Sequence, residues 1–331
     1  MEQVSRRELL LAASAVLAGT SSAAASGVPT RVLGRTGQRV SVIGVGGYHI
    51  ATPKEESESI RIMHAAVDEG VNFFDNCWDY HEGRAEEVMG KALAMDGYRK
   101  KVFLMTKVCG RDYETAKQHL DDSLRRLKTD YLDLWQFHEL VFDNDPDYVF
   151  DKGAMRAAEE ARKAGKVRFI GFTGHKDPRI HLKMLAKPFS WDSAQMPINV
   201  CDATYRSFQN EVLPVCLKNN VGVIGMKGLG GGFPDGRLVA NAGLSAEECY
   251  SWCLSLPVST QVMGITSMEQ LKQDVKLARE FKPLSSQAKQ ALLARVKDIA
   301  GDGRYELFKS SMVHDSPIHR RQHGFSEKMA D

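Results

Sequence analysis

The sequence predicts an α/β protein, specifically a (β/α)₈ TIM barrel with an N-terminal capping hairpin and an extra C-terminal helix. Eight short apolar runs alternate in order with segments of helical spacing, which is the count of such a barrel. Polar residues end several of these runs, where a barrel keeps its functional groups. An open doubly wound sheet is the alternative, but it predicts a G-x-G-x-x-G turn that Gly44-Val45-Gly46-Gly47 does not supply.

The elements follow from local pattern. The turn Gly34-Arg35-Thr36-Gly37 separates two short alternating runs and predicts the hairpin. Apolar runs predict strands at residues 41–45, 71–74, 101–106, 131–137, 167–172, 193–196, 221–226 and 258–263. Helical spacing predicts helices at residues 55–69, 84–95, 112–127, 147–164, 178–186, 206–219, 245–254, 267–280 and 285–299. We expect Pro214 to kink or restart its helix, and Ser245 and Glu248 to form a capping box.

Composition excludes several classes of protein. The net charge is +2 and the body has no Lys/Arg-rich block, which argues against a nucleic-acid partner. The six cysteines form no C-x-x-C pair, which argues against zinc-ribbon, iron–sulfur and thioredoxin-type sites. We expect mostly free thiols.

The N-terminus resembles an export signal. Arg6-Arg7 precedes a short apolar run that ends at Ala23-Ala24-Ala25, and the pair of arginines resembles a twin-arginine signal. The run is too short to cross a bilayer, so we expect no stable membrane insertion. The prediction is a signal at residues 1–25, a barrel at 30–300 and a polar tail at 301–331. The twin-arginine export machinery would then be a partner and the periplasm the location, with the cytoplasm as the alternative if the signal is not used.

Four polar residues lie at or just beyond the ends of three predicted strands. Asp75, Lys107 and His138 each follow an apolar run, and Tyr80 comes five positions after Asp75. An ammonium near a phenol lowers the phenol pKa from about 10, and a carboxylate holds that ammonium in place. A histidine can orient a carbonyl oxygen or relay a proton. The set suits proton donation to a carbonyl compound, whose carbon must receive hydride from a nicotinamide cofactor.

Other interpretations exist for these residues. Taken singly, each is a common structural residue: a cap, a packed tyrosine, a surface lysine or a core histidine. A metallohydrolase using Asp75, His81 and His138 is conceivable, but no His-x-His pair or H-E-x-x-H motif occurs. Joint placement at strand ends favours catalysis, and we predict no metal site.

The sequence is similar to those of aldo-keto reductases from Leu33 to the helix after Gly264. The resemblance rests on Phe73-Phe74-Asp75 through Tyr80 with Glu86-Glu87-Val88-Met89-Gly90-Lys91-Ala92-Leu93 behind it, on Met105-Thr106-Lys107, and on Tyr131-Leu132-Asp133-Leu134-Trp135-Gln136-Phe137-His138. It implies Tyr80 as the general acid, Lys107 and Asp75 as its tuning pair, and His138 as the residue that orients the substrate. The implied reaction is reversible reduction of an aldehyde or ketone to an alcohol.

The resemblance also implies cofactor contacts. Gln195 matches the contact to the nicotinamide amide, and Thr173 stands where relatives have Ser-Asn. The other candidate contacts are Gly47, Tyr48, Met226, Lys227, Gly228, Gly264, Thr266, Gln270 and Asp274. The start of the last barrel helix suits a phosphate, although it is also an ordinary cap. NADP is the implied cofactor, and NAD is the alternative because no cationic side chain lies between Gly264 and Leu271.

Further expectations concern the mouth of the barrel and the tail. Trp78, Tyr48 and Phe142 are candidates for the substrate pocket or for loop packing. The tail, with His314, His319, Arg320, Arg321 and His323, is expected to be solvated rather than to bind a metal. The altered fifth and seventh strand ends also fit a nicotinamide-binding sensor with little turnover.

Overall fold

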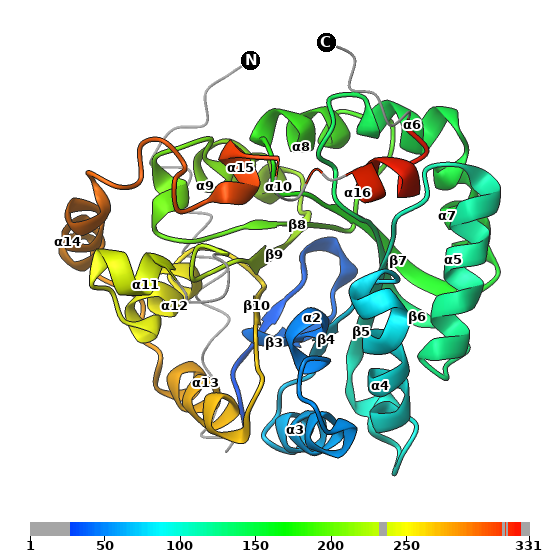
Figure 1. Ribbon diagram of the computed structural model, residues 1–331, viewed down its shortest axis with the longest axis horizontal. Coiled ribbons are helices and arrows are strands. Elements are labelled where there is room, and N and C mark those ends of the chain that lie inside the picture. Colours follow the sequence, from blue (N-terminus) through cyan, green and yellow to red (C-terminus); the bar gives the residue numbers. More distant parts are fainter. Residues whose placement is uncertain (1–26, 232–236, 313–314, 316, 326–331) are drawn as a thin grey trace.

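The structure is a computed structural model that describes residues 27–231, 237–312, 315 and 317–325. Its centre is a closed barrel of parallel strands in the order β10-β3-β4-β5-β6-β7-β8-β9, with helices around it (Figure 1). The predicted barrel is therefore confirmed, and the open sheet is wrong. The barrel strands are β3 (Ile43–Gly46), β4 (Phe73–Asp75), β5 (Phe103–Val108), β6 (Leu132–Phe137), β7 (Val167–Thr173), β8 (Ser193–Pro197), β9 (Gly222–Met226) and β10 (Thr260–Met263).

Most helices lie close to their predicted positions, but the two short helices at residues 47–50 and 237–242 were not predicted. The helices up to α14 are α2 (Gly47–Ile50), α3 (Glu56–Asp68), α4 (Arg84–Leu93), α5 (Tyr113–Arg126), α6 (Asp145–Asp151), α7 (Ala154–Lys163), α8 (Pro178–Leu185), α9 (Phe208–Glu211), α10 (Leu213–Lys218), α11 (Arg237–Ala242), α12 (Ala246–Leu254), α13 (Met268–Glu280) and α14 (Ser286–Val296). The capping box of Ser245 and Glu248 is present. The break before Pro214, between α9 and α10, is also confirmed.

One predicted helix is wrong. Residues 147–164 form two helices, α6 and α7, because the chain turns at Gly153 with a φ of 95°. A positive φ is easily adopted by glycine and ends a right-handed helix. An apolar face of helical period continues across this turn, which is why periodicity alone predicted a single helix.

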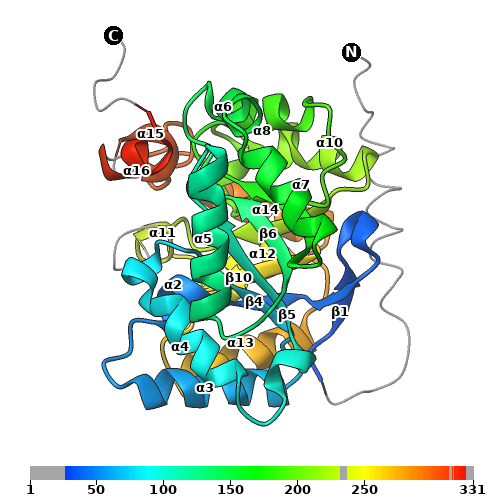
Figure 2. The ribbon, with the colours of Figure 1, turned by 90° about the vertical axis from the view of Figure 1, so that its right-hand side faces the viewer.

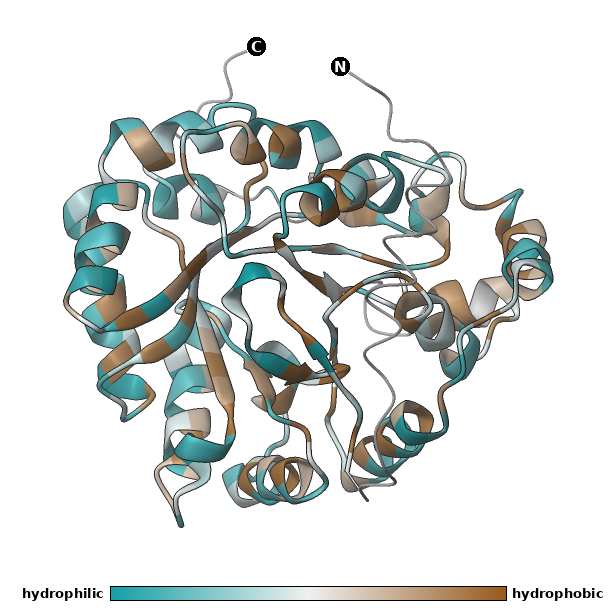
Figure 3. Cartoon of the chain, turned by 180° about the vertical axis from the view of Figure 1, so that it is seen from behind, coloured by the Kyte–Doolittle hydropathy of each residue, from teal (hydrophilic) through white to brown (hydrophobic). Residues whose placement is uncertain are grey.

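The core has two layers. Phe73, Phe103, Met105, Leu134 and Ile224 fill the inside of the barrel. A larger apolar layer lies between the strands and the surrounding helices. Figure 3 shows this arrangement as brown strands inside helices that turn teal faces outward. Burial from water of both faces of the sheet explains why the strands read as continuous apolar runs.

The hairpin closes the amino-terminal end of the barrel. Strands β1 (Thr30–Val32) and β2 (Arg39–Ser41) pair antiparallel, and Leu33 between them is fully buried with the inner core. Gly34 packs so tightly that an added Cβ would lie 2.2 Å from the backbone nitrogen of Gly222. Figure 2 shows β1 at one end of the barrel and the last helices, α15 (Leu307–Ser310) and α16 (Pro317–Gln322), at the other.

The expectation of a solvated tail is wrong for much of residues 301–325. Lys309 is fully buried, with its Nζ atom 2.6 Å from Asp202 Oδ1 and 2.9 Å from Glu306 Oε1. His323 is also fully buried, with Nδ1 3.2 Å from Asp145 Oδ1. The Lys309 ion pairs and the contact of His323 with Asp145 therefore hold the tail against the body, since buried polar and charged groups need partners.

Two further expectations concern the ends of the chain and the thiols. All six cysteines are free, in line with the expectation of mostly free thiols, and all six are buried. Within the described part of the chain, no helix has both the length and the apolar character needed to cross a bilayer. Residues 1–25, where the export signal is predicted, and His314 lie outside the described residues.

Candidate active site

The barrel brings the four candidate catalytic residues together. Asp75 ends β4, Lys107 lies near the end of β5, and His138 directly follows β6. These strands are neighbours in the barrel, so their carboxyl ends meet at one side of the mouth. Tyr80 begins the short 3₁₀ segment η3 (Tyr80–Gly83), which returns its ring over the same place.

The ammonium of Lys107 is the centre of this group. Its Nζ atom donates to Asp75 Oδ1 at 2.7 Å and to the carbonyl oxygen of Asn76 at 2.7 Å. The Tyr80 hydroxyl lies 3.4 Å from the same nitrogen. The lysine and aspartate side chains are only 1% and 3% exposed. A buried charge pair with its hydrogen bonds satisfied holds the phenol in a fixed position.

The direction of the Tyr80 pKa differs from the sequence expectation. The pKa of Tyr80 lies well above its usual value of 10, because burial raises it and the Asp75 carboxylate raises it further. The expected lowering by Lys107 is therefore wrong as a net effect. Asp75 neutralises the ammonium that would have favoured the phenolate. Tyr80 is held as the protonated phenol, which is the form that donates a proton.

His138 is held as a neutral imidazole. Its pKa lies well below the usual value, because burial and then the nearby Lys107 charge disfavour the imidazolium. Its ring meets the Tyr80 ring edge-on, with centroids 5.7 Å apart. Its Nδ1 atom lies 3.0 Å from Cys77 Sγ and 3.6 Å from Cys109 Sγ. Neither thiol was predicted as a site residue, although Cys77 lies two positions after Asp75 and Cys109 lies two positions after Lys107.

Gln195 is the middle residue of β8, and Thr173 is the last residue of β7. Gln195 Nε2 donates to Asp75 Oδ2 at 2.8 Å. This hydrogen bond connects the side of the mouth formed by β7 and β8 to the catalytic group. The Oε1 atom of Gln195 is buried without a hydrogen-bond partner. An open acceptor of this kind suits the amide N–H₂ of a nicotinamide. The Thr173 carbonyl oxygen accepts from the Leu140 backbone N–H at 2.9 Å.

Gly47 and Tyr48 line the neighbouring part of the mouth. A Cβ atom on Gly47 would lie 2.6 Å from the Asp75 carbonyl oxygen, so only glycine fits there without a shift. Tyr48 is 47% exposed and meets Tyr80 edge-on at 5.5 Å. Tyr48 therefore presents an open aromatic side chain directly beside the phenol.

The loop after β9 begins at Met226 and Lys227. Lys227 has a φ of 57°, and its ammonium lies 5.0 Å from the centre of the Phe308 ring in α15. Burial lowers the pKa of Lys227 to about 8. Gly228 packs closely against Tyr250, where a Cβ would lie 2.9 Å from the ring. The docked tail therefore covers the base of the glycine-rich loop.

The start of α13 carries the remaining candidate contacts. Gly264 lies against His49, since an added Cβ would be 2.8 Å from that ring. The backbone N–H of Thr266 donates to Gln270 Oε1 at 2.7 Å. Burial raises the pKa of Asp274 to about 7. A phosphate at this helix start would have to displace the Gln270 side chain from the Thr266 N–H.

The three candidates for the substrate pocket have different surroundings. Trp78 stacks on His119, with ring centroids 3.5 Å apart. Phe142 packs edge-on against Phe325 of the tail at 5.0 Å. Both are engaged in loop packing, and Tyr48 is the exposed one of the three.

The structure does not assemble the metallohydrolase site considered from the sequence. His81 Nε2 lies 2.8 Å from the Tyr48 carbonyl oxygen, while Asp75 is held by Lys107. In the described ranges, the one group of side chains placed to hold a metal ion is different and consists of Cys77, Asp79, Cys109 and His138.

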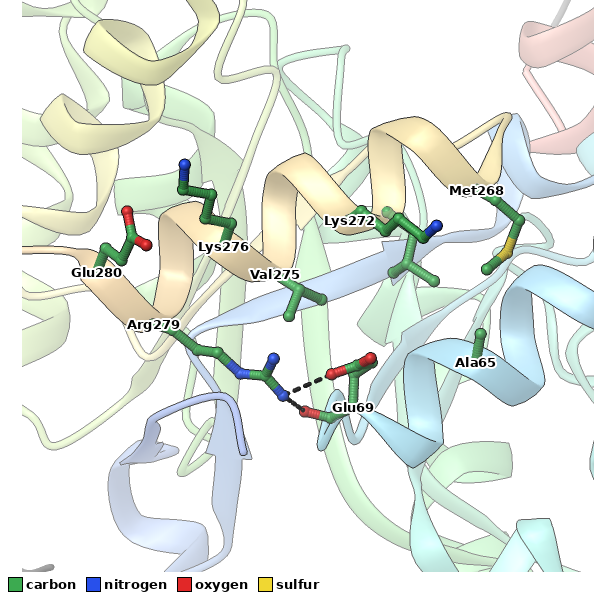
Figure 4. A pocket seen from close by; sticks show the side chains of 9 residues that line it. Ala65, Glu69, Met268, Lys272, Val275, Lys276, Arg279 and Glu280 are labelled. Carbon is green, nitrogen blue, oxygen red and sulfur yellow. Dashed lines mark hydrogen bonds and ion pairs between the residues drawn. The ribbon is translucent and has the colours of Figure 1, made fainter. Parts of the chain in front are cut away.

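A separate cleft lies outside the barrel, between α3 and α13. Figure 4 shows Lys272, Lys276 and Arg279 along α13, with Arg279 bonded to Glu69, which directly follows α3. The Arg279–Glu69 ion pair measures 2.6 Å and crosses the cleft. The cleft has a volume of about 260 Å³, and none of the candidate catalytic residues lines it.

Comparisons with known proteins identify the family of this chain. The family model "Aldo/keto reductase family" matches residues 42–248. The chain is 28% identical over 298 residues to "Uncharacterized oxidoreductase YrpG" of Bacillus subtilis, covering 74% of this chain and 89% of that protein. It is 30% identical over 258 residues to "Aldo-keto reductase AFTS1" of Alternaria alternata, covering 64% of this chain and 69% of that protein.

The chain is also similar in fold to a solved structure. The holo form of aldo-keto reductase AKR11C1 from Bacillus halodurans superposes with a TM-score of 0.68 at 26% identity, covering 81% of this chain and 96% of that one. A closed parallel barrel with a polar group at its strand ends defines a TIM-barrel protein with its site at the mouth. The chain belongs to the aldo/keto reductase family. Members of this family use NADP(H), in line with the cofactor predicted from the sequence.

Proposed function

We propose that the protein reversibly reduces an aldehyde or ketone to an alcohol, with NADPH or NADH as the hydride donor. The observation that supports this most strongly is the Lys107 ammonium, which contacts both the Asp75 carboxylate and the Tyr80 hydroxyl. Membership of the aldo/keto reductase family supports an NAD(P)-dependent oxidoreductase in general. The substrate class follows from the paired need for a proton and a hydride.

Tyr80 is the general acid in this proposal. The nicotinamide supplies hydride to the carbonyl carbon, and Tyr80 gives its phenolic proton to the carbonyl oxygen. The raised pKa keeps that proton on Tyr80 until the oxygen becomes basic. Lys107 then stabilises the phenolate through its 3.4 Å contact. In the reverse direction, the phenolate accepts the alcohol proton.

His138 orients the substrate in this scheme. As a neutral imidazole it can donate one hydrogen bond to the carbonyl oxygen without supplying a net charge. Asp75 acts through Lys107, whose ammonium it holds at 2.7 Å. Gln195 is joined to the same carboxylate and offers its open Oε1 atom to the nicotinamide amide.

The cofactor contacts are part of the same proposal. The open Oε1 atom of Gln195 supports a nicotinamide near Tyr80. Lys227 offers a cation for a phosphate, because it directly follows β9 at the mouth. The absorbance and mass of cofactor released from protein purified without added nucleotide would distinguish NADP(H) from NAD(H).

Substitution of Tyr80 by Phe tests the catalytic assignment. We expect Tyr80→Phe to reduce turnover of an aldehyde panel by about 10²–10⁴-fold, the usual contribution of a general acid. NADPH affinity, measured by fluorescence quenching, should stay within about twofold, because the change removes one hydroxyl and leaves the mouth otherwise intact. Tyr98→Phe is the matched control, since its hydroxyl pairs with Asp68 outside the mouth. Unchanged turnover in Tyr80→Phe contradicts the assignment, and tight NADPH binding by a wild-type protein that turns over no substrate favours the sensor instead.

We also propose that the chain is exported through the twin-arginine route. The support is the order of Arg6-Arg7, apolar run and Ala23-Ala24-Ala25 in the sequence. Folded proteins use this route, so the enzyme would carry its cofactor with it. Fractionation of cells that express the full chain, compared with Arg6→Lys/Arg7→Lys, measures export directly. Equal periplasmic amounts of the two proteins would contradict it.

A further inference from the structure

A cluster of four side chains surrounds the Nδ1 face of His138. Cys77 and Asp79 follow β4, Cys109 follows β5, and His138 follows β6, so three adjacent strand ends contribute to it. One ligand atom from each lies within 4.8 Å of the others. Both thiols are fully buried, and Asp79 Oδ1 is buried without a hydrogen-bond partner.

We propose that Cys77, Cys109, His138 and Asp79 bind a divalent metal ion of the zinc class. Two thiolates, an imidazole and a carboxylate are a tetrahedral donor set that favours Zn²⁺ over the hard cations Mg²⁺ and Ca²⁺. The proposed proton and hydride transfers use no metal, so this site is additional to the proposed reductase activity and does not depend on it.

Two of the three distances from His138 Nδ1 are close to those of a tetrahedral site. Usual zinc bond lengths place a sulfur and a nitrogen ligand about 3.6 Å apart, and a nitrogen and an oxygen ligand about 3.4 Å apart. His138 Nδ1 lies 3.6 Å from Cys109 Sγ and 3.6 Å from Asp79 Oδ1. Its distance to Cys77 Sγ is 3.0 Å, so that sulfur would move outward by about half an ångström.

Arg111 holds the backbone of the cluster in place. Its guanidinium is fully buried and paired with Asp145 at 2.9 Å. It donates to the carbonyl oxygens of Cys109 at 3.0 Å and of His138 at 2.5 Å. Partners of this kind orient the ligands of protein metal sites.

Metal binding at the site balances in protons and in charge. Each thiol loses a proton to water as its sulfur bonds the metal, and the two thiolates offset the two charges of the ion. The local net charge beside Tyr80 therefore does not change. Coordination at Nδ1 leaves the imidazole proton on Nε2, so the metal would fix His138 as a hydrogen-bond donor through its other nitrogen.

Cobalt titration of the full chain tests the site. The protein is first reduced and stripped with a chelator, and Co²⁺ is then added without oxygen. We expect one Co²⁺ per chain, with thiolate charge-transfer bands and the intense visible bands of tetrahedral Co²⁺, and displacement of Co²⁺ by Zn²⁺. We expect Cys77→Ser/Cys109→Ser to abolish the charge-transfer bands and to weaken binding by about 100-fold or more.

Two controls keep the result interpretable. Cys201→Ser/Cys216→Ser removes two other buried free thiols and should keep full binding. Asp79→Asn removes one charge from a partly exposed position and should weaken binding by about tenfold while keeping the sulfur bands. Circular dichroism shows whether each variant is folded. The proposal would be overturned if the wild-type protein did not bind Co²⁺ stoichiometrically. It would also be overturned if the wild type and the folded Asp79→Asn variant bound Co²⁺ with equal affinity and neither showed sulfur bands.

Discussion

Substitution of Lys107 by Met should destabilise the fold strongly. The Lys107–Asp75 pair spans 2.7 Å with side chains only 1% and 3% exposed. At that distance, two charges attract by about 6 kcal/mol at an effective dielectric constant of 20, before desolvation is subtracted. Removal of one partner leaves a buried carboxylate uncompensated, which typically costs about 3–5 kcal/mol. A loss of that size is a large part of the 5–15 kcal/mol that stabilises a typical domain.

Urea unfolding monitored by circular dichroism and tryptophan fluorescence measures this loss. The matched control is Lys91→Met, because Lys91 pairs with Glu56 at 2.8 Å but the two side chains are 45% and 37% exposed. An exposed pair contributes about 0–1 kcal/mol, so we expect a small effect there.

A double variant separates lost charge pairing from lost packing. In Asp75→Asn/Lys107→Met the buried carboxylate is gone, so we expect at least about 1 kcal/mol less destabilisation than in Lys107→Met alone. The reasoning would be refuted if Lys107→Met cost no more than Lys91→Met. It would also be refuted if Asp75→Asn/Lys107→Met were less stable than Lys107→Met by several kcal/mol.

Two further predictions concern pH and packing. Burial raises the pKa of Glu139 to about 7, so its folded form binds a proton more tightly than the unfolded chain does. Its stabilising contribution is complete below about pH 4, where both forms are protonated, and is lost as pH rises through 7. Between pH 5 and pH 8 the wild type should therefore lose up to about 3 kcal/mol relative to Glu139→Gln, measured by urea unfolding, and parallel pH profiles would contradict this. Separately, a Cβ on Gly90 would lie 2.1 Å from the Arg126 carbonyl oxygen, whereas one on Gly301 would meet nothing within 4 Å. Gly90→Ala should cost about 1–3 kcal/mol or more and Gly301→Ala less than about 0.5 kcal/mol, and equal thermal shifts would show that α4 and α5 can separate without loss.

The sequence by itself determined the barrel and the place of its candidate catalytic residues. Eight apolar runs in order fix the strands, because a parallel strand buried on both faces needs a continuous apolar segment. Asp75, Lys107 and His138 could be located because the end of an apolar run is a local feature, and strand ends of a barrel share one face. The capping box at Ser245 was predictable for the same reason, since it involves neighbours in the chain.

Only the tertiary structure decided what surrounds those residues. His323 lies beside Arg111 across 212 positions in the sequence, and Lys309 lies beside Asp202 across 107. A contact between residues so far apart in the sequence leaves no local pattern. The charge-rich tail at residues 301–331 was therefore predicted to be solvated. The Cys77, Cys109 and His138 cluster was missed because the three residues belong to different strand-end loops. The direction of the Tyr80 pKa also depends on the whole site, because burial and the Asp75 carboxylate act together against the Lys107 ammonium. A pKa is set by the summed field and solvation at one point in space, and those exist only after the chain has folded.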